Sequence, residues 1–225
     1  MDFIFMLTRG DRTVEDCLVV LDEILPLGLK HIGFKDVGVE FEVLVKLTER
    51  IRRGGALSYM EVVSETPEAC LRSAAAAKTL GIDRLLGGTD VAAVKRIIAG
   101  TSTIYYPFPG FPGGHPTKLG GQPGDVAAHC EKFMAEGCGG CDLLAYRATE
   151  ADPLDLVRAA RRGLGKAGYL IVAGSIASRQ RIADVAAAGG DAFTIGTAVF
   201  DGSYSPRKGS ILSQLGDVIA DCATV

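Results

Sequence analysis

Short apolar runs rich in β-forming residues alternate along this chain with longer runs of helical periodicity, and this alternation constrains the fold more than any other feature. Parallel strands joined by helical crossovers produce this order of elements. The predicted strands are Phe3–Thr8, His31–Lys35, Ala56–Val63, Arg84–Gly87, Thr103–Tyr106, Asp142–Tyr146, Tyr169–Ala173 and Ala192–Ile195. The predicted helices include Val14–Leu25, Glu40–Arg53, Glu68–Leu80, Asp125–Ala135, Leu154–Leu164, Arg179–Ala188 and Ile211–Cys222.

Eight strand–helix units use up nearly all of the 225 residues. This length is close to the lower limit for a complete eight-stranded barrel, and 48% hydrophobic residues supply one large core. We therefore expect an α/β protein with a single (β/α)8 TIM-barrel domain that spans residues 1–225. An open, doubly wound sheet is the alternative.

Several helix boundaries carry recognisable capping residues. Thr66-Pro67-Glu68 has the order of an N-cap, a first-turn proline and a first-turn acid, and Asp125 and Ser178 are further N-cap candidates. Gly81, Gly137 and Gly189 follow helical runs at positions where a left-handed C-cap is expected.

Composition argues against several classes of partner. The formal charge is −3 and the Lys and Arg residues are scattered, so we expect no nucleic-acid surface. No apolar run approaches the roughly 20 residues of a membrane span, and the apolar N-terminus lacks a basic leader. We expect a cytoplasmic protein without a membrane contact; a homo-oligomer stays open.

The six cysteines suggest packing rather than chemistry. Cys138 and Cys141 have CxxC spacing, but only His129 and Cys130 lie nearby as further ligands. We expect the cysteines to be small core residues, with no disulfide and no metal site.

Two glycine-containing turns near the end of the chain point to an anion site. Val172-Ala173-Gly174-Ser175 ends the seventh predicted strand, and Phe193-Thr194-Ile195-Gly196-Thr197 ends the eighth. Glycine at such a turn lets backbone N–H groups approach an anion closely. Because active sites of this barrel lie at the C-terminal ends of the strands, we expect Gly174, Ser175, Gly196 and Thr197 to bind one phosphate.

The stretch VAGSIASRQRIADVAAAGGDAFTIGTAVF, residues 172–200, resembles the C-terminal quarter of the ribulose-phosphate-binding barrels. These include the histidine-pathway barrels, the sugar-phosphate epimerases and the N-acylmannosamine-6-phosphate epimerases. The resemblance implies a substrate phosphate on the turns after strands seven and eight. The paired His and Asp residues of the metal-dependent pentulose-phosphate epimerases do not reappear here, nor does the lysine-bearing sixth strand of the ketohydroxyacid aldolases.

Two charged residues stand inside apolar strands. Lys35 ends the second predicted strand, and Glu61 lies in the third on the same face as Tyr59. An unpaired buried charge is costly, so both need an explanation. We expect Lys35 and Glu61 to meet at the barrel mouth as an acid–base pair. Lys35 could instead form a Schiff base or clamp an enolate, and a structural ion pair with Asp36 or another acid is the plain alternative.

Other polar residues follow the first, fifth and sixth predicted strands. Arg9, Tyr146, Arg147 and His115 are candidate substrate-binding residues. His115 belongs to the stretch 107–116, whose prolines and glycines predict an irregular loop that serves as a lid or as a subunit contact.

The combined interpretation is an enzyme of carbohydrate metabolism that acts on a small phosphorylated carbohydrate or a related phosphometabolite. The expected reaction is isomerisation or epimerisation by proton transfer without an organic cofactor. An aldolase or lyase with Lys35 as Schiff-base nucleophile is one alternative. A non-catalytic barrel that binds a phosphometabolite is the other, because this fold hosts many functions.

Overall fold

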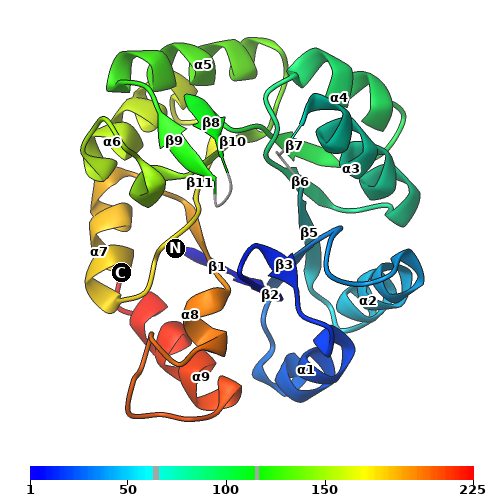
Figure 1. Cartoon of the computed structure of the whole chain (residues 1–225). Helices are drawn as coiled ribbons and strands as arrows, with labels where there is room; N and C mark the ends of the chain where they lie inside the picture. Colours follow the sequence, from blue (N-terminus) through cyan, green and yellow to red (C-terminus); the bar gives the residue numbers. More distant parts are fainter. Residues whose placement is uncertain (63–65, 115–116) are drawn as a thin grey trace.

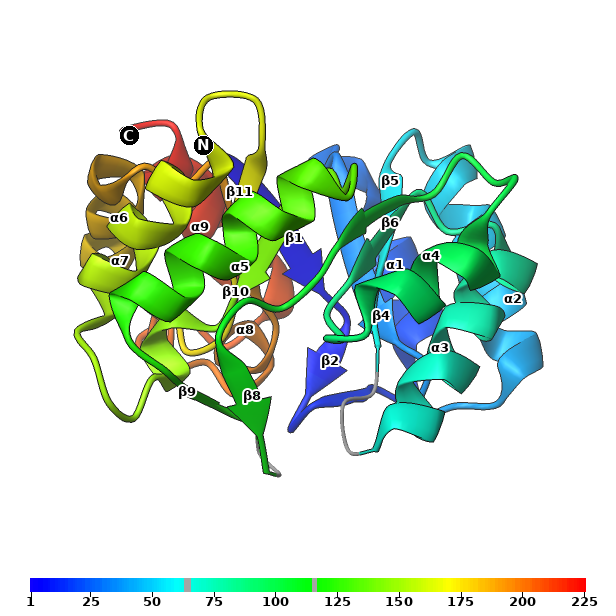
Figure 2. The same ribbon diagram turned by 90° about the horizontal axis from the view of Figure 1, so that it is seen from above.

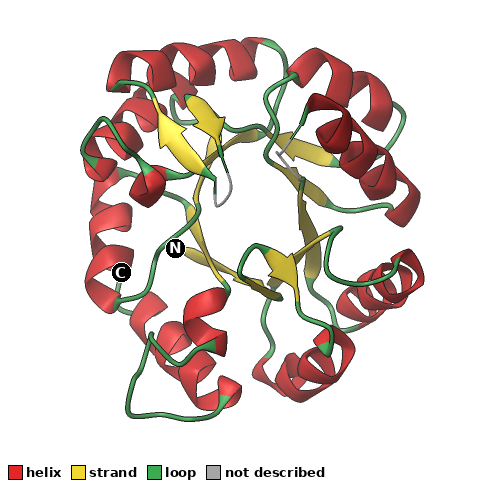
Figure 3. Ribbon diagram, in the orientation of Figure 1, coloured by secondary structure: helices red, strands yellow, loops and turns green. Residues whose placement is uncertain are grey.

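The structure is a computed structural model that describes residues 1–62, 66–114 and 117–225. Eight parallel strands form one sheet in the order β10-β11-β12-β1-β4-β5-β6-β7. Helices surround this sheet as an outer ring (Figures 1 and 3). The predicted (β/α)8 TIM barrel is confirmed. The strands are β1 (Asp2–Met6), β4 (His31–Lys35), β5 (Leu57–Glu61), β6 (Arg84–Leu86), β7 (Ile104–Tyr106), β10 (Gly140–Leu143), β11 (Tyr169–Val172) and β12 (Ala192–Ile195).

Two backbone hydrogen bonds join the ends of the sheet and nearly close the barrel. The amide of Gly139 donates to the carbonyl of Tyr105 at 2.9 Å, and the amide of Asp142 donates to the carbonyl of Pro107 at 3.0 Å. These bonds link β10 to β7, so the open doubly wound sheet is excluded.

The helices begin and end largely where the capping residues predict. The side chain of Thr66 accepts a hydrogen bond from the amide of Ala69, and that of Ser178 accepts one from Arg181. The N-cap of α5 is Gln122 rather than Asp125, whose carboxylate instead accepts from the amide of Gln122. The helices are α1 (Cys17–Ile24), α2 (Phe41–Arg53), α3 (Pro67–Leu80), α4 (Val91–Ile98), α5 (Pro123–Ala135), α6 (Pro153–Leu164), α7 (Arg179–Ala188), α8 (Thr197–Phe200) and α9 (Ile211–Cys222), with 3-10 turns η1 (Leu25–Leu27) and η2 (Ala145–Arg147).

Apolar side chains fill two separate regions, one inside the barrel and one between strands and helices. The inner cluster is small and holds two tyrosines; it consists of Ile4, Met6, Tyr59, Leu86, Tyr106, Ile171 and Ala192. The outer cluster holds the buried cysteines, and the sulfurs of Cys130 and Cys141 lie 3.7 Å apart there. Among the described residues, no helix is long and apolar enough to cross a membrane.

Two hairpins project from the C-terminal end of the barrel, away from the chain termini (Figure 2). The first pairs β2 (Thr8–Arg9) with β3 (Arg12–Thr13), and the second pairs β8 (Phe111–Gly113) with β9 (Lys118–Gly120). The expectation of an irregular loop over 107–116 is therefore wrong for Phe111–Gly113. Proline at position 112 is tolerated because both strands of this two-stranded sheet are edge strands.

Close contact between β10 and β11 requires glycine at position 140. A Cβ atom there would lie 1.9 Å from the carbonyl oxygen of Tyr169, and the φ angle of Gly140 is +150°. Gly140→Ala should lower the free energy of unfolding by at least about 2 kcal/mol in urea denaturation, because neighbouring backbone cannot move aside. The matched control is Gly216→Ala in α9, where a Cβ meets nothing within 4 Å. That change should leave the free energy of unfolding unchanged or raise it by up to ~1 kcal/mol. Equal effects at both positions would contradict the packing argument.

Candidate active site at the barrel mouth

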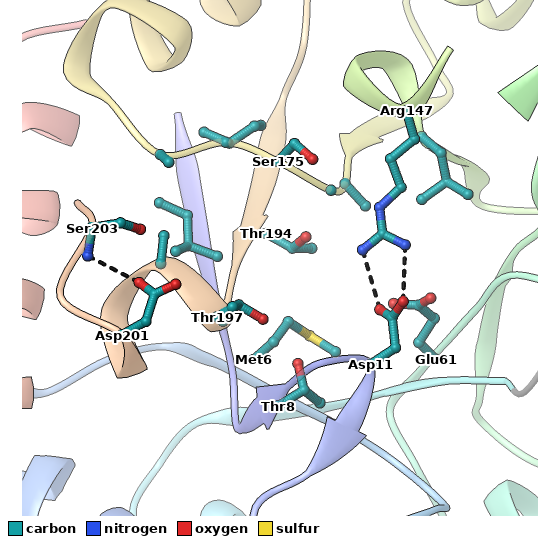
Figure 4. Close-up of a pocket in the computed structure, with 18 of the residues that line it drawn as sticks. Met6, Thr8, Asp11, Glu61, Arg147, Ser175, Thr194, Thr197, Asp201 and Ser203 are labelled. Carbon is teal, nitrogen blue, oxygen red and sulfur yellow. Dashed lines mark hydrogen bonds and ion pairs between the residues drawn. The ribbon is translucent and has the colours of Figure 1, made fainter. Parts of the chain in front are cut away.

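A cavity of about 320 Å³ opens at the C-terminal ends of the strands (Figure 4). Its walls come from opposite halves of the sequence. One end, the charged end, holds Asp11, Lys35, Glu61 and Arg147, while the other consists of the turns after β11 and β12, with the carboxylate of Asp201 beside them. The lining residues are Met6, Thr8, Asp11, Lys35, Glu61, Leu144, Arg147, Ala173, Gly174, Ser175, Ile176, Ala177, Thr194, Ile195, Gly196, Thr197, Ala198, Asp201 and Ser203.

Lys35 and Glu61 meet at the charged end. They are register partners at the last positions of β4 and β5, so their side chains leave the barrel wall side by side. The Nζ atom of Lys35 lies 3.0 Å from Oε1 of Glu61, and both side chains are mostly buried, at 10% and 14% exposure. The neighbouring acid Asp36 accepts a hydrogen bond from Ser73 instead. The structure therefore brings the predicted pair together.

Lys35 is held as an ammonium ion. Burial lowers its pKa, but the charges of Glu61 and Asp11, together with their hydrogen bonds, outweigh burial and raise the pKa above its usual value. Asp11 supplies the second carboxylate, with Oδ1 at 3.3 Å from Nζ. A lysine with two anionic partners donates protons and stabilises anions better than it acts as a neutral nucleophile.

Asp11 reaches the cavity because of an unusual turn. Gly10 and Asp11 connect β2 to β3 with φ values of +57° and +61°, as a two-residue hairpin of the primed type requires. The turn projects the Asp11 carboxylate over the barrel mouth, where Arg147 binds it in a bidentate pair. Nη1 lies 3.1 Å from Oδ2 and Nη2 lies 3.1 Å from Oδ1. Figure 4 shows Arg147 reaching Asp11 with Glu61 beside it.

Both predicted glycine turns line the other end of the cavity. Gly174 has φ of +80°, and a Cβ there would lie 2.6 Å from Nε of Arg147, which crosses this turn. A Cβ at Gly196 would lie 2.6 Å from the carbonyl oxygen of Thr8. Thr197 accepts a hydrogen bond from the amide of Gly10 at 3.2 Å, which ties the second turn to the first hairpin. Gly174, Ser175, Gly196 and Thr197 thus converge on one space.

Backbone strain is concentrated at this cavity. Among the described residues, Asp11 and Ser175 are the two non-glycine residues with positive φ, and both line the cavity. Left-handed conformations of such residues persist where the surrounding structure enforces them, which happens most often at functional sites.

Two other candidates lie elsewhere, and one falls outside the described residues. Arg9 lies on a separate hollow with Arg12 and Phe200. The ring of Tyr146 packs under the guanidinium of Arg181, 4.7 Å from its centroid. His115 belongs to the residues that the structure does not describe. A substrate contact by any of these three remains a prediction.

The sequence interpretation omitted two acidic groups, Asp11 and Asp142. Asp11 follows the first predicted strand, and the Gly10-Asp11 pair, a typical two-residue hairpin turn, is the sequence signal that could have located it. Asp142 was treated as the first residue of a strand, whereas β10 begins at Gly140 and Asp142 is fully buried inside it. The signal that was available is its period: two residues after Gly140 and two before Leu144, it shares their face.

Comparison with solved structures supports the fold. The native KDPGal structure matches with a TM-score of 0.69 and 12% identity, over 100% of this chain and 93% of that one. Orotidine 5'-phosphate decarboxylase from Pyrococcus horikoshii OT3 matches with a TM-score of 0.64 and 14% identity, over 99% of this chain and 100% of that one. Thiamine phosphate pyrophosphorylase from Pyrococcus furiosus matches with a TM-score of 0.62 and 14% identity, over 96% of this chain and 95% of that one. No family model matches the sequence, and a search of the curated proteins finds no match. At these identities the likeness establishes the TIM-barrel fold.

The ion pairs of Asp11 make stability depend on pH. Burial raises the pKa of Asp11. The hydrogen bonds and charges of Arg147 and Lys35 lower the pKa by more than burial raises it, so it falls from an ordinary 3.8 to about 2. A lowered carboxyl pKa stabilises the fold above pH 3.8, and this contribution disappears as the pH falls toward 2. Asp11→Asn should therefore lose about 2 kcal/mol of unfolding free energy at pH 7. The difference from the unsubstituted protein should shrink at pH 3, as urea denaturation can measure.

Asp155→Asn is the control for this prediction. Asp155 pairs with Arg158 on the surface of α6, where both side chains are more than half exposed. Such pairs contribute little, so the loss should stay below about 1 kcal/mol at either pH. An Asp11→Asn defect that is the same at pH 7 and pH 3 would show that ionisation of Asp11 is not its cause.

Proposed function

We propose that this chain is an enzyme that isomerises or epimerises a small phosphorylated carbohydrate or a related phosphometabolite by proton transfer. The observation that carries the proposal is one cavity with the Lys35–Glu61 pair at one end and both glycine turns at the other. Its volume, about 320 Å³, is near the small end of the range for metabolite pockets, roughly 300–1,000 Å³. A short, phosphorylated substrate would span the two ends.

The glycine turns support phosphate as the anchoring group. The cavity end that they form carries the hydroxyl groups of Ser175 and Thr197. Arg147 crosses the Gly174 turn, and Arg181 donates a hydrogen bond to the carbonyl of Ser175. Arg181 does not line the cavity and Arg147 is paired with Asp11, so an anion at this end depends on the backbone N–H groups of the turns and on these hydroxyl groups. Two of the matched barrels are named for phosphate compounds, orotidine 5'-phosphate and thiamine phosphate, which agrees with this assignment.

The charged end supports proton transfer next to a carbonyl group. In this scheme Glu61 removes a proton from the carbon beside the carbonyl, and the Lys35 ammonium stabilises the negative charge that develops on the oxygen. Glu61 then returns the proton to the neighbouring carbon while a proton passes between the two oxygens of the enediolate, which completes an isomerisation. Epimerisation instead needs a second proton donor on the opposite face of the carbon, because Glu61 reaches only the face from which it took the proton. The raised pKa of Lys35 favours this scheme over an aldolase or lyase that attacks through a neutral amine. A barrel that binds the same compound without turnover remains the alternative function.

Ala198 offers a test of the phosphate end, since it lines the cavity at the start of α8. Ala198→Asp should weaken binding of ribulose 5-phosphate about tenfold or more, because the new carboxylate repels the phosphate. Isothermal titration calorimetry measures the change. Ala198→Asn is the matched control of equal size without charge, and its affinity should stay within about threefold.

Equal losses in both variants would show that volume rather than charge is responsible. Unchanged affinity in Ala198→Asp would remove phosphate from this end of the cavity. Unphosphorylated ribulose should bind weakly to every variant, because it lacks the group that the turns recognise.

Deuterium exchange tests the reaction at the charged end. The protein should catalyse incorporation of deuterium from D2O at the carbon beside the carbonyl group in at least one of a panel of ketose and aldose phosphates. Proton NMR measures the rate of this exchange. Lys35→Met should lower the exchange rate by about 100-fold or more, because the enolate loses its counter-charge. Borohydride added with the same compound should leave the mass of the protein unchanged.

A reduced adduct on Lys35 would favour the aldolase or lyase over the isomerase. Tight binding without exchange or any other turnover across the panel would favour the non-catalytic barrel. Lys46→Met, at a lysine on the outer surface of α2, is the control and should exchange at the unsubstituted rate.

A further inference from the structure

Asp142 lies in the barrel interior, directly beneath the cavity. Its register partner on β11 is Ile171, a member of the inner cluster. Leu144, just past the end of β10, lines the cavity, and the register partner Ile171 places Asp142 on the inner face of the strand that leads to it. The side chain has 0% exposure.

Neither carboxyl oxygen of Asp142 has a hydrogen-bond partner among residues 1–62, 66–114 and 117–225. Buried polar groups in folded proteins nearly always have such partners. An ionised carboxyl group without water or donors is strongly disfavoured, whereas the protonated form is tolerated. The surroundings of Asp142 therefore select the neutral acid.

Asp142 also faces the charged end of the cavity. Register partners lead from Glu61 to Leu86 and Tyr106, and the amide of Asp142 then bonds to the carbonyl of Pro107, the next residue. The charges that act on Asp142 are those of Glu61, Lys35 and Arg147. Burial raises its pKa most and Glu61 raises it further, while the two cations lower it, so the pKa stays well above its usual value.

Both cations already have anionic partners. Lys35 contacts Glu61 and Asp11, and Arg147 binds Asp11 through two hydrogen bonds. Two cations thus face two carboxylates, and a third carboxylate at Asp142 would leave the cluster with an uncompensated negative charge. When two carboxyl groups share such a site, one of them keeps a proton, and it is the group with fewer hydrogen-bond donors. Glu61 has the Lys35 ammonium as a donor and Asp142 has none among the described residues, so Asp142 keeps the proton.

We infer that Asp142 is a positioning residue that holds this proton beneath the cavity, so that Glu61 is the carboxyl group that stays ionised and paired with Lys35. The inference rests on the proposed function, since it explains how Glu61 is kept as the base. A neutral Asp142 also keeps the charged end balanced before an anionic substrate enters. Removal of Glu61 removes the competing charge, so Asp142 should then lose its proton more easily.

Carbon-13 NMR of the whole, unliganded protein tests this inference. The carboxyl carbons of Asp and Glu are labelled, and Asp142→Asn identifies the Asp142 signal. At pH 7 that signal should lie at the protonated position. In Glu61→Gln its titration midpoint should fall by about one pH unit or more. Glu131→Gln, the same substitution on the exposed face of α5, should leave the midpoint unchanged.

An Asp142 carboxyl group that is ionised at pH 7 would overturn the inference, and so would a midpoint that Glu61→Gln does not move. The signal of the unsubstituted protein at pH 7 decides the first point even if a variant fails to fold. No phosphate compound is present in the sample, so failure of phosphate binding or deuterium exchange leaves this result unaffected. Conversely, an ionised Asp142 leaves the phosphate site untouched.

Discussion

A lysine ammonium group at the mouth of an apolar barrel must be neutralised, and the architecture of the cavity follows from this requirement. Lys35 ends a strand whose inner neighbours are methionine and tyrosine, so water cannot solvate it fully. Glu61 supplies one counter-charge from the next strand. Asp11 supplies the second and recruits Arg147 from the far side of the mouth. A single buried charge thereby fixes the positions of side chains from the neighbouring strand β5, from the β2–β3 hairpin and from the 3-10 turn η2.

This arrangement separates two kinds of recognition within one cavity. At one end, charged side chains select for groups that gain or lose protons. At the other, backbone turns with little side-chain bulk select for a compact anion. Closure of the sheet between β7 and β10 keeps the two ends at a fixed separation, because the barrel wall cannot open without breaking backbone hydrogen bonds. Rigid placement of this kind favours catalysis by orientation.

The sequence predicted the parts of this molecule that depend on local pattern. Strand positions, most helix caps and the Lys35–Glu61 contact follow from periodicity and from the rarity of charge in apolar runs. Asp11 was missed because the Gly10-Asp11 pair predicts a hairpin but not the direction in which the turn projects the carboxylate. Asp142 was missed because Cys138-Gly139-Gly140-Cys141 hides the start of β10, so the acid was placed at the first position of the strand rather than within it, although a shift of two residues leaves its face unchanged. The β8–β9 hairpin was missed because its composition is that of a loop.

The hydrogen bond from Gly10 to Thr197 spans 187 positions of the chain. It depends on the pairing of β12 with β1, which are the last and the first strands along the chain. The charged end of the cavity depends on the same event, because the hairpin that carries Asp11 rests on the β12 turn. Contacts between distant segments form late and slowly in folding, since the entropy of the intervening chain must first be lost. A chain in which β12 has not paired with β1 lacks the turn on which this hairpin rests, so the cavity is complete only when both ends of the chain are in place.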